Sequence, residues 1–234
     1  MITQLLVPFG TALQDAAGSS IGMDLLHTFI RWLHILAGIV WIGHLYFFNF
    51  VNANFAPTMD AETKRKVVPQ LMPRALFWFR MGAATTWITG VLLFGLVYMM
   101  SPAVMQSTVL LDDGTTKEVI SNRTWWILTG ALFGTIMAYN VWFIIWPKQK
   151  RIITAVRDGQ KPEDAWVKTA TKASKVNTYL SVPLLLTMVS NSIPTLFSDR
   201  VMGLPNLAFL GVMIVIGLLT VYGWYKIAPG VKGF

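Results

Sequence analysis

Five stretches of the chain are apolar over the length that a membrane-spanning helix requires, and polar segments separate them. The stretches are residues 25–50, 76–100, 125–146, 177–198 and 206–228. About 20 residues cross a bilayer as one helix. The fourth stretch contains prolines and small polar residues, which a span tolerates where neighbouring helices satisfy the backbone. The pattern predicts an all-α integral membrane protein, a five-transmembrane-helix bundle that forms a single domain over residues 1–234 and contacts membrane lipid.

The segments between these stretches predict further structure. Residues 108–120 place two β-prone arms around an Asp-Asp-Gly turn, which predicts a small hairpin. The third helix is expected to run on to Asp158 and to end at Gly159. Pro162 then begins a second helix within this loop, with acidic residues in its first turn and lysines near its end. Met1–Gly22 holds no Lys or Arg and is expected to be a tail rather than a secretory signal.

Basic residues alternate between the two sides of the predicted bundle. The segments after the first, third and fifth spans, together with Lys226 at the end of the fifth, hold 14 Lys and Arg, whereas the remaining segments outside the spans hold 3. The positive-inside rule therefore predicts an N-terminus outside and a C-terminus in the cytoplasm. The hairpin is then on the outer side, and the long helical loop is on the inner side.

Composition narrows the classes of chemistry. The chain is 54% hydrophobic and 13% charged, with a mean hydropathy of +0.55, which is typical of a membrane protein. It has no cysteine, which excludes disulfides, thiolate metal sites and cysteine nucleophiles. The net charge of +8 is explained by basic inner loops, so we expect no nucleic-acid partner.

The first span carries all three histidines of the chain, His27, His34 and His44, together with Arg31. Ionisable side chains inside a span are expensive and therefore indicate function. At about 100° per residue, His27, Arg31, His34 and Gly38 fall on one stripe of the helix. His44 lies about 15 Å further along the axis, towards the predicted inner leaflet.

His34 is the leading candidate for a metal ligand, because a buried neutral imidazole needs a hydrogen-bond partner or a metal. Haem iron is the metal that we expect, which makes haem b the predicted cofactor. Gly38 would leave room for a flat macrocycle, and Arg31 would pair with its propionates. His44 is a candidate second ligand, with an interfacial histidine as the alternative. His27 is a candidate propionate contact or a surface residue.

Two questions about His34 stay open from the residues alone. The structural alternative is an imidazole hydrogen-bonded to a carbonyl, to Asn191 or to Ser192. The second axial ligand is also undetermined, because no other predicted span contains a histidine. It would be a lysine, a water, a histidine from another subunit, or a methionine such as Met81, Met137 or Met188.

A family resemblance appears in the third and fourth spans. Met137–Pro194, with its distinctive NVWFIIWPKQK and NTYLSVP patterns, resembles the N-terminal transmembrane domain of the bacterial membrane-bound urate oxidases known as PuuD. Arg31–Phe48 and Thr85–Phe94 match the same domain in order. The resemblance implies a polytopic protein of a bacterial inner membrane. Full-length members of this family end in a c-type cytochrome domain and pass electrons from a purine to a respiratory chain.

The resemblance carries over unevenly to this chain. His34 matches the family's histidine in the first span. The family pattern has histidines where this chain has Leu128, Val176 and Ser192, and the chain contains no CxxCH motif for a c-type haem. The resemblance therefore implies a divergent member that works with other membrane subunits or a separate c-type cytochrome.

Three functions follow as hypotheses. The first is a b-type haem electron-transfer subunit of a respiratory or oxidoreductase complex, in which His34 is an iron ligand. The second is a cofactor-free accessory subunit that packs against a larger complex through faces of small residues. The third is a urate oxidase that uses a separate cytochrome c.

Overall fold

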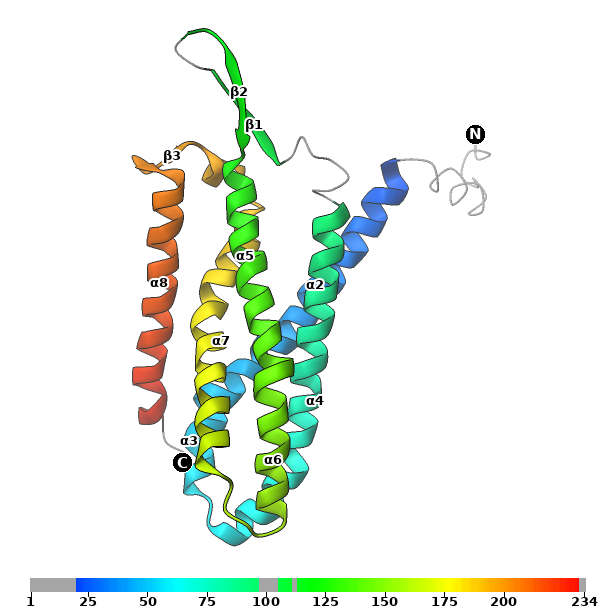
Figure 1. Cartoon of the computed structure of the whole chain (residues 1–234), viewed down its shortest axis with the longest axis vertical. Helices are drawn as coiled ribbons and strands as arrows, with labels where there is room; N and C mark the ends of the chain where they lie inside the picture. The colour runs from blue at the N-terminus through cyan, green and yellow to red at the C-terminus, as the bar shows by residue number, and fades with distance from the viewer. Residues whose placement is uncertain (1–19, 97–104, 111–112, 232–234) are drawn as a thin grey trace, which may run out of the picture.

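The structure is a computed structural model that describes residues 20–96, 105–110 and 113–231. It is a bundle of long helices with a β-hairpin standing at one end (Figure 1). The helices and strands are α2 (Ser20–Tyr46), α3 (Ala53–Phe55), α4 (Ala61–Phe94), β1 (Gln106–Leu110), β2 (Thr116–Ile120), α5 (Asn122–Tyr139), α6 (Trp146–Arg157), α7 (Asp164–Ser190), β3 (Arg200–Val201), β4 (Leu204–Pro205) and α8 (Asn206–Ile227).

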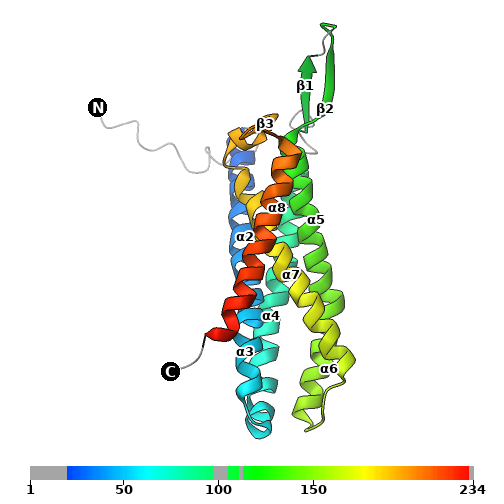
Figure 2. The same ribbon diagram turned by 90° about the vertical axis from the view of Figure 1, so that its left-hand side faces the viewer.

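The helices pack in a chain of neighbours. Helix α2 packs against α4, α5 packs against α7, and α7 packs against α8. Figure 1 shows α8 at one side of the bundle and α4 at the other, and Figure 2 shows the same bundle after a 90° turn. Trp41, Leu45, Phe79 and Met137, which α2, α4 and α5 contribute, are at most 1% exposed and form the centre of the main core cluster.

Four helical segments are long and apolar enough to cross a membrane. They are Ile21–Thr58, Ala61–Phe94, Asn122–Arg157 and Asn206–Gly230. Three of the predicted spans lie within the first, third and fourth of these segments. The predicted second span, residues 76–100, overlaps Ala61–Phe94, although residues 97–100 lie outside the described residues.

Helix α7 replaces two predicted elements. The short loop helix from Pro162 and the span 177–198 form one continuous helix, Asp164–Ser190, because no glycine or proline separates them. The helix ends before Pro194, where a 3₁₀ turn begins. This helix is not among the four segments apolar enough to cross a membrane. Its buried face is rich in small polar residues: Asn177, Thr178, Ser181, Thr187 and Ser190.

Helix α4 begins much earlier than the predicted second span. Asp60 caps its first turn by accepting a hydrogen bond from the Thr63 backbone N–H at 2.8 Å. Pro69 and Pro73 lie inside this helix and do not end it. We expected residues 51–75 to be a loop between the first two spans; the capping aspartate and the packing of Met72 and the following residues in the core favour helix instead.

Two of the long helices widen into π-helix near their predicted inner ends. Helix α2 passes into the π-segment Phe47–Asn52, and α5 passes into Asn140–Ile145 before continuing as α6. Asn49 and Asn140 are buried within these segments. Because π-turns occur frequently at functional sites, the half of the bundle opposite the hairpin is a second region to search for function.

The predicted hairpin and the predicted end of the third helix are confirmed. Strands β1 and β2 pair antiparallel with Gln106 opposite Ile120. Asp113 accepts hydrogen bonds from the Thr115 backbone N–H and hydroxyl at 2.9 and 2.6 Å, and this shifts the carboxyl pKa downward. Helix α6 ends at Arg157, and Gly159 follows with φ +72°, a conformation that favours glycine.

Candidate functional site

His34 is buried where α2 meets α4 and α7. Its side chain is 8% exposed. The ring nitrogen Nδ1 lies 3.0 Å from the Thr89 hydroxyl on α4, and Nε2 lies 3.3 Å from the Met188 sulfur on α7. One imidazole of the first helix therefore joins residues that are 55 and 154 positions away in the sequence.

The hydrogen bonds around Thr89 determine which nitrogen of His34 carries the proton. The Thr89 hydroxyl lies 2.6 Å from the Thr85 carbonyl oxygen and 3.1 Å from the Thr86 carbonyl oxygen. Its one proton is directed at these backbone carbonyls, and Thr85 is the nearer of the two. The Thr89 hydroxyl oxygen must then accept from His34 Nδ1–H. The lone pair of the imidazole is therefore on Nε2, the nitrogen that faces Met188.

A lone pair that faces a thioether makes no hydrogen bond, because the Met188 sulfur has no proton to donate. The pair does present two metal donors, an imidazole nitrogen and a thioether sulfur. Ligating histidines commonly donate the other ring N–H to an oxygen acceptor, as His34 does to Thr89. The chemistry of this pair matches the His/Met ligation that is found in cytochromes.

The nitrogen and the sulfur lie 3.3 Å apart, so a metal that took both as ligands would require the Met188 side chain to move away from His34. Met188 is unbranched and 41% exposed, so its side chain can turn outward at low cost.

Glycines and unpaired polar groups surround the imidazole. A Cβ atom on Gly90 would lie 3.1 Å from Cε1 of His34, so the ring occupies space that only glycine leaves. Gly38, one turn after His34, faces the Thr86 side chain. The Thr86 hydroxyl and the Trp41 indole N–H are buried without a hydrogen-bond partner in the described part of the chain. These two groups lie on the helices that carry His34 and Thr89, and they are available as donors to a polar ligand.

The other predicted site residues on α2 lie away from His34. Arg31 is exposed and its guanidinium donates to His27 Nε2 at 3.2 Å, one turn earlier. Asn191 accepts a hydrogen bond from Arg123 at 2.9 Å. The structural alternative named a carbonyl, Asn191 or Ser192 as the partner of His34. The structure places the Thr89 hydroxyl at its Nδ1, together with a hydrogen bond to the Thr86 backbone.

His44 lines a separate groove on the α2–α4 surface. Its Nδ1–H donates to the Val40 carbonyl at 2.7 Å. The groove has a volume of about 460 Å³, and its other lining residues are apolar: Ile39, Val40, Gly43, Phe47, Leu71 and Ala75. His44 is half-buried, and no hydrogen bond to its Nε2 occurs among the described residues.

A polar network in the half of the bundle opposite the hairpin was not anticipated from the sequence. Asn49 donates to Ser174 at 2.8 Å and accepts from the Tyr225 hydroxyl at 2.8 Å. Asn140 donates to Asn177 at 2.8 Å. Both asparagines lie in the π-segments and both contact α7, so the π-turns aim polar groups at its polar face. Asparagines within otherwise apolar stretches were the signal that was available.

Comparison with models of known protein families identifies the family of this chain. A family model described as urate oxidase N-terminal matches residues 59–113 and 102–227. The chain belongs to this family. The matched segments contain Thr89, Gly90 and Met188, whereas His34 precedes them. No curated protein and no solved structure matches the chain.

In the described ranges, no three histidine, aspartate or glutamate side chains come together to form a metal site. Within those ranges the fold brings one histidine nitrogen and one methionine sulfur together, Nε2 of His34 and the sulfur of Met188. Met188 was one of three methionines considered as a second ligand, and Met137 is instead fully buried in the core.

Proposed function

We propose that this chain is a membrane-embedded electron-transfer subunit that holds haem b between His34 and Met188. The observation that supports this proposal most directly is the distance of 3.3 Å between Nε2 of His34, which bears the lone pair, and the Met188 sulfur. Haem bound there would supply one-electron transfer. Family membership supports a role beside a respiratory chain.

The residues around the site have separate roles in this proposal. Thr89 holds the imidazole in the tautomer that binds metal and fixes the ring plane. Gly90 leaves room for the ring. Arg31 donates to His27 one turn earlier, so a contact with propionates would require its guanidinium to leave that partner.

A visible spectrum of the purified protein tests the proposal. We expect a reduced-minus-oxidised difference spectrum with the bands of a six-coordinate b-type haem. His34→Ala should abolish these bands, whereas Met188→Leu should retain haem and lower its midpoint potential, because thioether ligation raises the potential. His27→Ala is the matched control, since it removes a histidine of the same helix outside the site.

The absence of haem bands in well-folded protein, reconstituted with haemin, would contradict the proposal. The chain would then be a cofactor-free accessory subunit. Retention of the complete spectrum by His34→Ala would contradict the ligand assignment alone. His44, which lines the separate groove, would then be the candidate ligand.

Family membership favours one second candidate, a urate-oxidising subunit that passes electrons to a separate cytochrome c. Its test is reduction of added cytochrome c by the membrane-embedded protein in the presence of urate. Urate-dependent reduction that is lost in His34→Ala would support this function. A rate equal to that of empty membranes would exclude it.

A further inference from the structure

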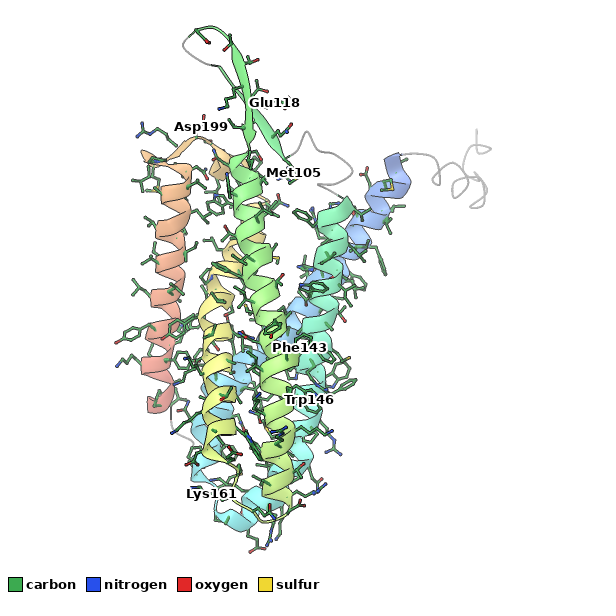
Figure 3. The ribbon with its side chains drawn as sticks, in the orientation of Figure 1. Met105, Glu118, Phe143, Trp146, Lys161 and Asp199 are labelled. Carbon is green, nitrogen blue, oxygen red and sulfur yellow. The ribbon has the colours of Figure 1, made fainter. Side chains whose placement is uncertain are left out.

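A cup at the junction of α6 and α7 lies outside the site around His34. It has a volume of about 550 Å³. Two tryptophans, Trp146 and Trp166, and two cations, Lys150 and Arg151, line it. Figure 3 labels Trp146, at the start of α6, and Lys161, near the end of the bundle that lies opposite the hairpin.

The position of the cup along the helix is that of a membrane interface. Trp125 near the start of α5 and Trp146 at the start of α6 are separated by 21 residues, which is about 32 Å at the helical rise. The hydrocarbon core of a bilayer is about 30 Å thick, and tryptophans concentrate at both of its edges. Lys150 and Arg151 follow Trp146 by about one turn and therefore reach the level of the lipid headgroups.

The cations of the cup are not neutralised by carboxylates. In the described part of the chain, neither Lys150 nor Arg151 has a carboxylate within 4.0 Å. Asp158 also lines the cup, but it pairs with Arg157 at 2.8 Å. The cup therefore attracts an anion.

Aromatic rings hold the cations and the wall of the cup in place. The Arg151 guanidinium of α6 lies 5.4 Å from the centre of the Trp166 ring of α7, and this contact connects the two helices. Arg80 of α4 stacks on the Trp146 ring at 3.4 Å. These contacts fix a cup whose wall combines indole surface with positive charge, as a ligand with an anionic head and an apolar body requires.

We propose that this cup binds the headgroup of an anionic phospholipid. Lys150 and Arg151 would bind the phosphodiester, and Trp146 would lie against the glycerol and the first carbons of the acyl chains. Basic pockets beside spans on the cytoplasmic side recognise such headgroups. The 14 basic residues on the predicted inner side make this face the one that anionic lipid would meet.

Lipid retention by the purified full chain tests the proposal. Detergent-solubilised protein is incubated with phosphatidylglycerol or with phosphatidylcholine of the same acyl chains, and bound lipid is counted by native mass spectrometry. We expect selective retention of phosphatidylglycerol. Lys150→Gln with Arg151→Gln should weaken it roughly 30-fold, from the usual contribution of two basic residues near anionic lipid.

A second pair of substitutions removes the same charge outside the cup. Lys161→Gln with Lys168→Gln should leave retention unchanged, because both lysines are exposed and neither lines the cup. Equal weakening by the two pairs would overturn the proposal, as would equal retention of the two lipids. The thermal midpoint of each variant without lipid confirms that it is folded.

Inorganic phosphate separates a lipid site from a site for a soluble anion. At concentrations equal to that of the lipid, phosphate should not displace phosphatidylglycerol. Displacement would overturn the assignment to lipid and indicate a soluble phosphate-bearing ligand. The haem spectrum is independent of this experiment, so either proposal can fail alone.

Discussion

The side-chain amide of Asn140 donates to the side-chain oxygen of Asn177 at 2.8 Å, inside the helix bundle. Asn177 in turn donates to the Met137 carbonyl at 2.9 Å and is fully buried. We expect Asn177→Leu to destabilise the protein by about 1–3 kcal/mol, because it leaves the buried side-chain amide of Asn140 without its partner. Thermal or denaturant unfolding in detergent measures the loss.

A double-mutant cycle separates this bond from simple packing. Asn140→Leu with Asn177→Leu should cost less than the sum of the two single changes, because the second change removes a group that is already unpaired. Strict additivity would show that the two amides do not interact in the folded protein.

Gly90→Ala should displace the His34 ring. The new Cβ would lie 3.1 Å from Cε1 of the imidazole, closer than carbon atoms normally pack. We expect haem occupancy to fall several-fold, as measured by the ratio of Soret to protein absorbance. Gly95→Ala is the matched control near the end of the same helix, where a Cβ meets no atom within 4 Å.

Gly82→Ala should separate α2 from α4. The added Cβ would lie 2.9 Å from the Trp41 backbone nitrogen, and backbone cannot turn aside as a flexible side chain can. We expect a loss of about 1–3 kcal/mol in unfolding experiments, the usual cost of overpacking. Gly43→Ala on the facing helix has open space around it and should change stability by less than about 0.5 kcal/mol.

The cap of α4 should make stability depend on pH. Hydrogen bonds from the Thr63 backbone N–H and then from its hydroxyl hold the pKa of Asp60 below its ordinary value. A lowered folded-state pKa means that the carboxylate stabilises the protein above the ordinary aspartate pKa, and that this stability is lost as the pH falls through the folded-state value.

Comparison of Asp60→Ala with the unmodified protein checks this pH dependence. The variant should unfold at a lower temperature at neutral pH, and the difference should shrink in acid. Asp60→Asn keeps a capping side chain without a charge and should show the smaller loss at neutral pH. A difference that stays constant down to strongly acidic pH would show that ionisation of Asp60 does not support the cap.

Much of the architecture was predictable because lipid imposes simple rules on length and polarity. The hairpin, the end of α6 near Asp158 and the bounds of α8 follow from turn residues and apolar length. The early start of α4 was not predicted, since Pro69 and Pro73 usually break helices in isolation and core packing decided otherwise. The continuity of α7 was missed because its polar residues face neighbouring helices, a fact that only the packed bundle provides.

The candidate site was predictable only in part. His34 was identifiable because an imidazole within an apolar span is rare. Its partners were not, because Thr89 and Met188 reach it from helices that lie far away in the sequence. Several methionines were equally good candidates for a second ligand in the sequence. Only the packing of α2 against α7 brings one of them, Met188, next to His34.

The hairpin of β1 and β2 stands clear of the helices in both views (Figures 1 and 2). Its turn at Asp113 and Gly114 is exposed. An epitope inserted between those two residues would leave the helices undisturbed. In intact cells an antibody would reach that tag from one compartment only, so this small appendage offers a direct readout of which way the whole protein faces.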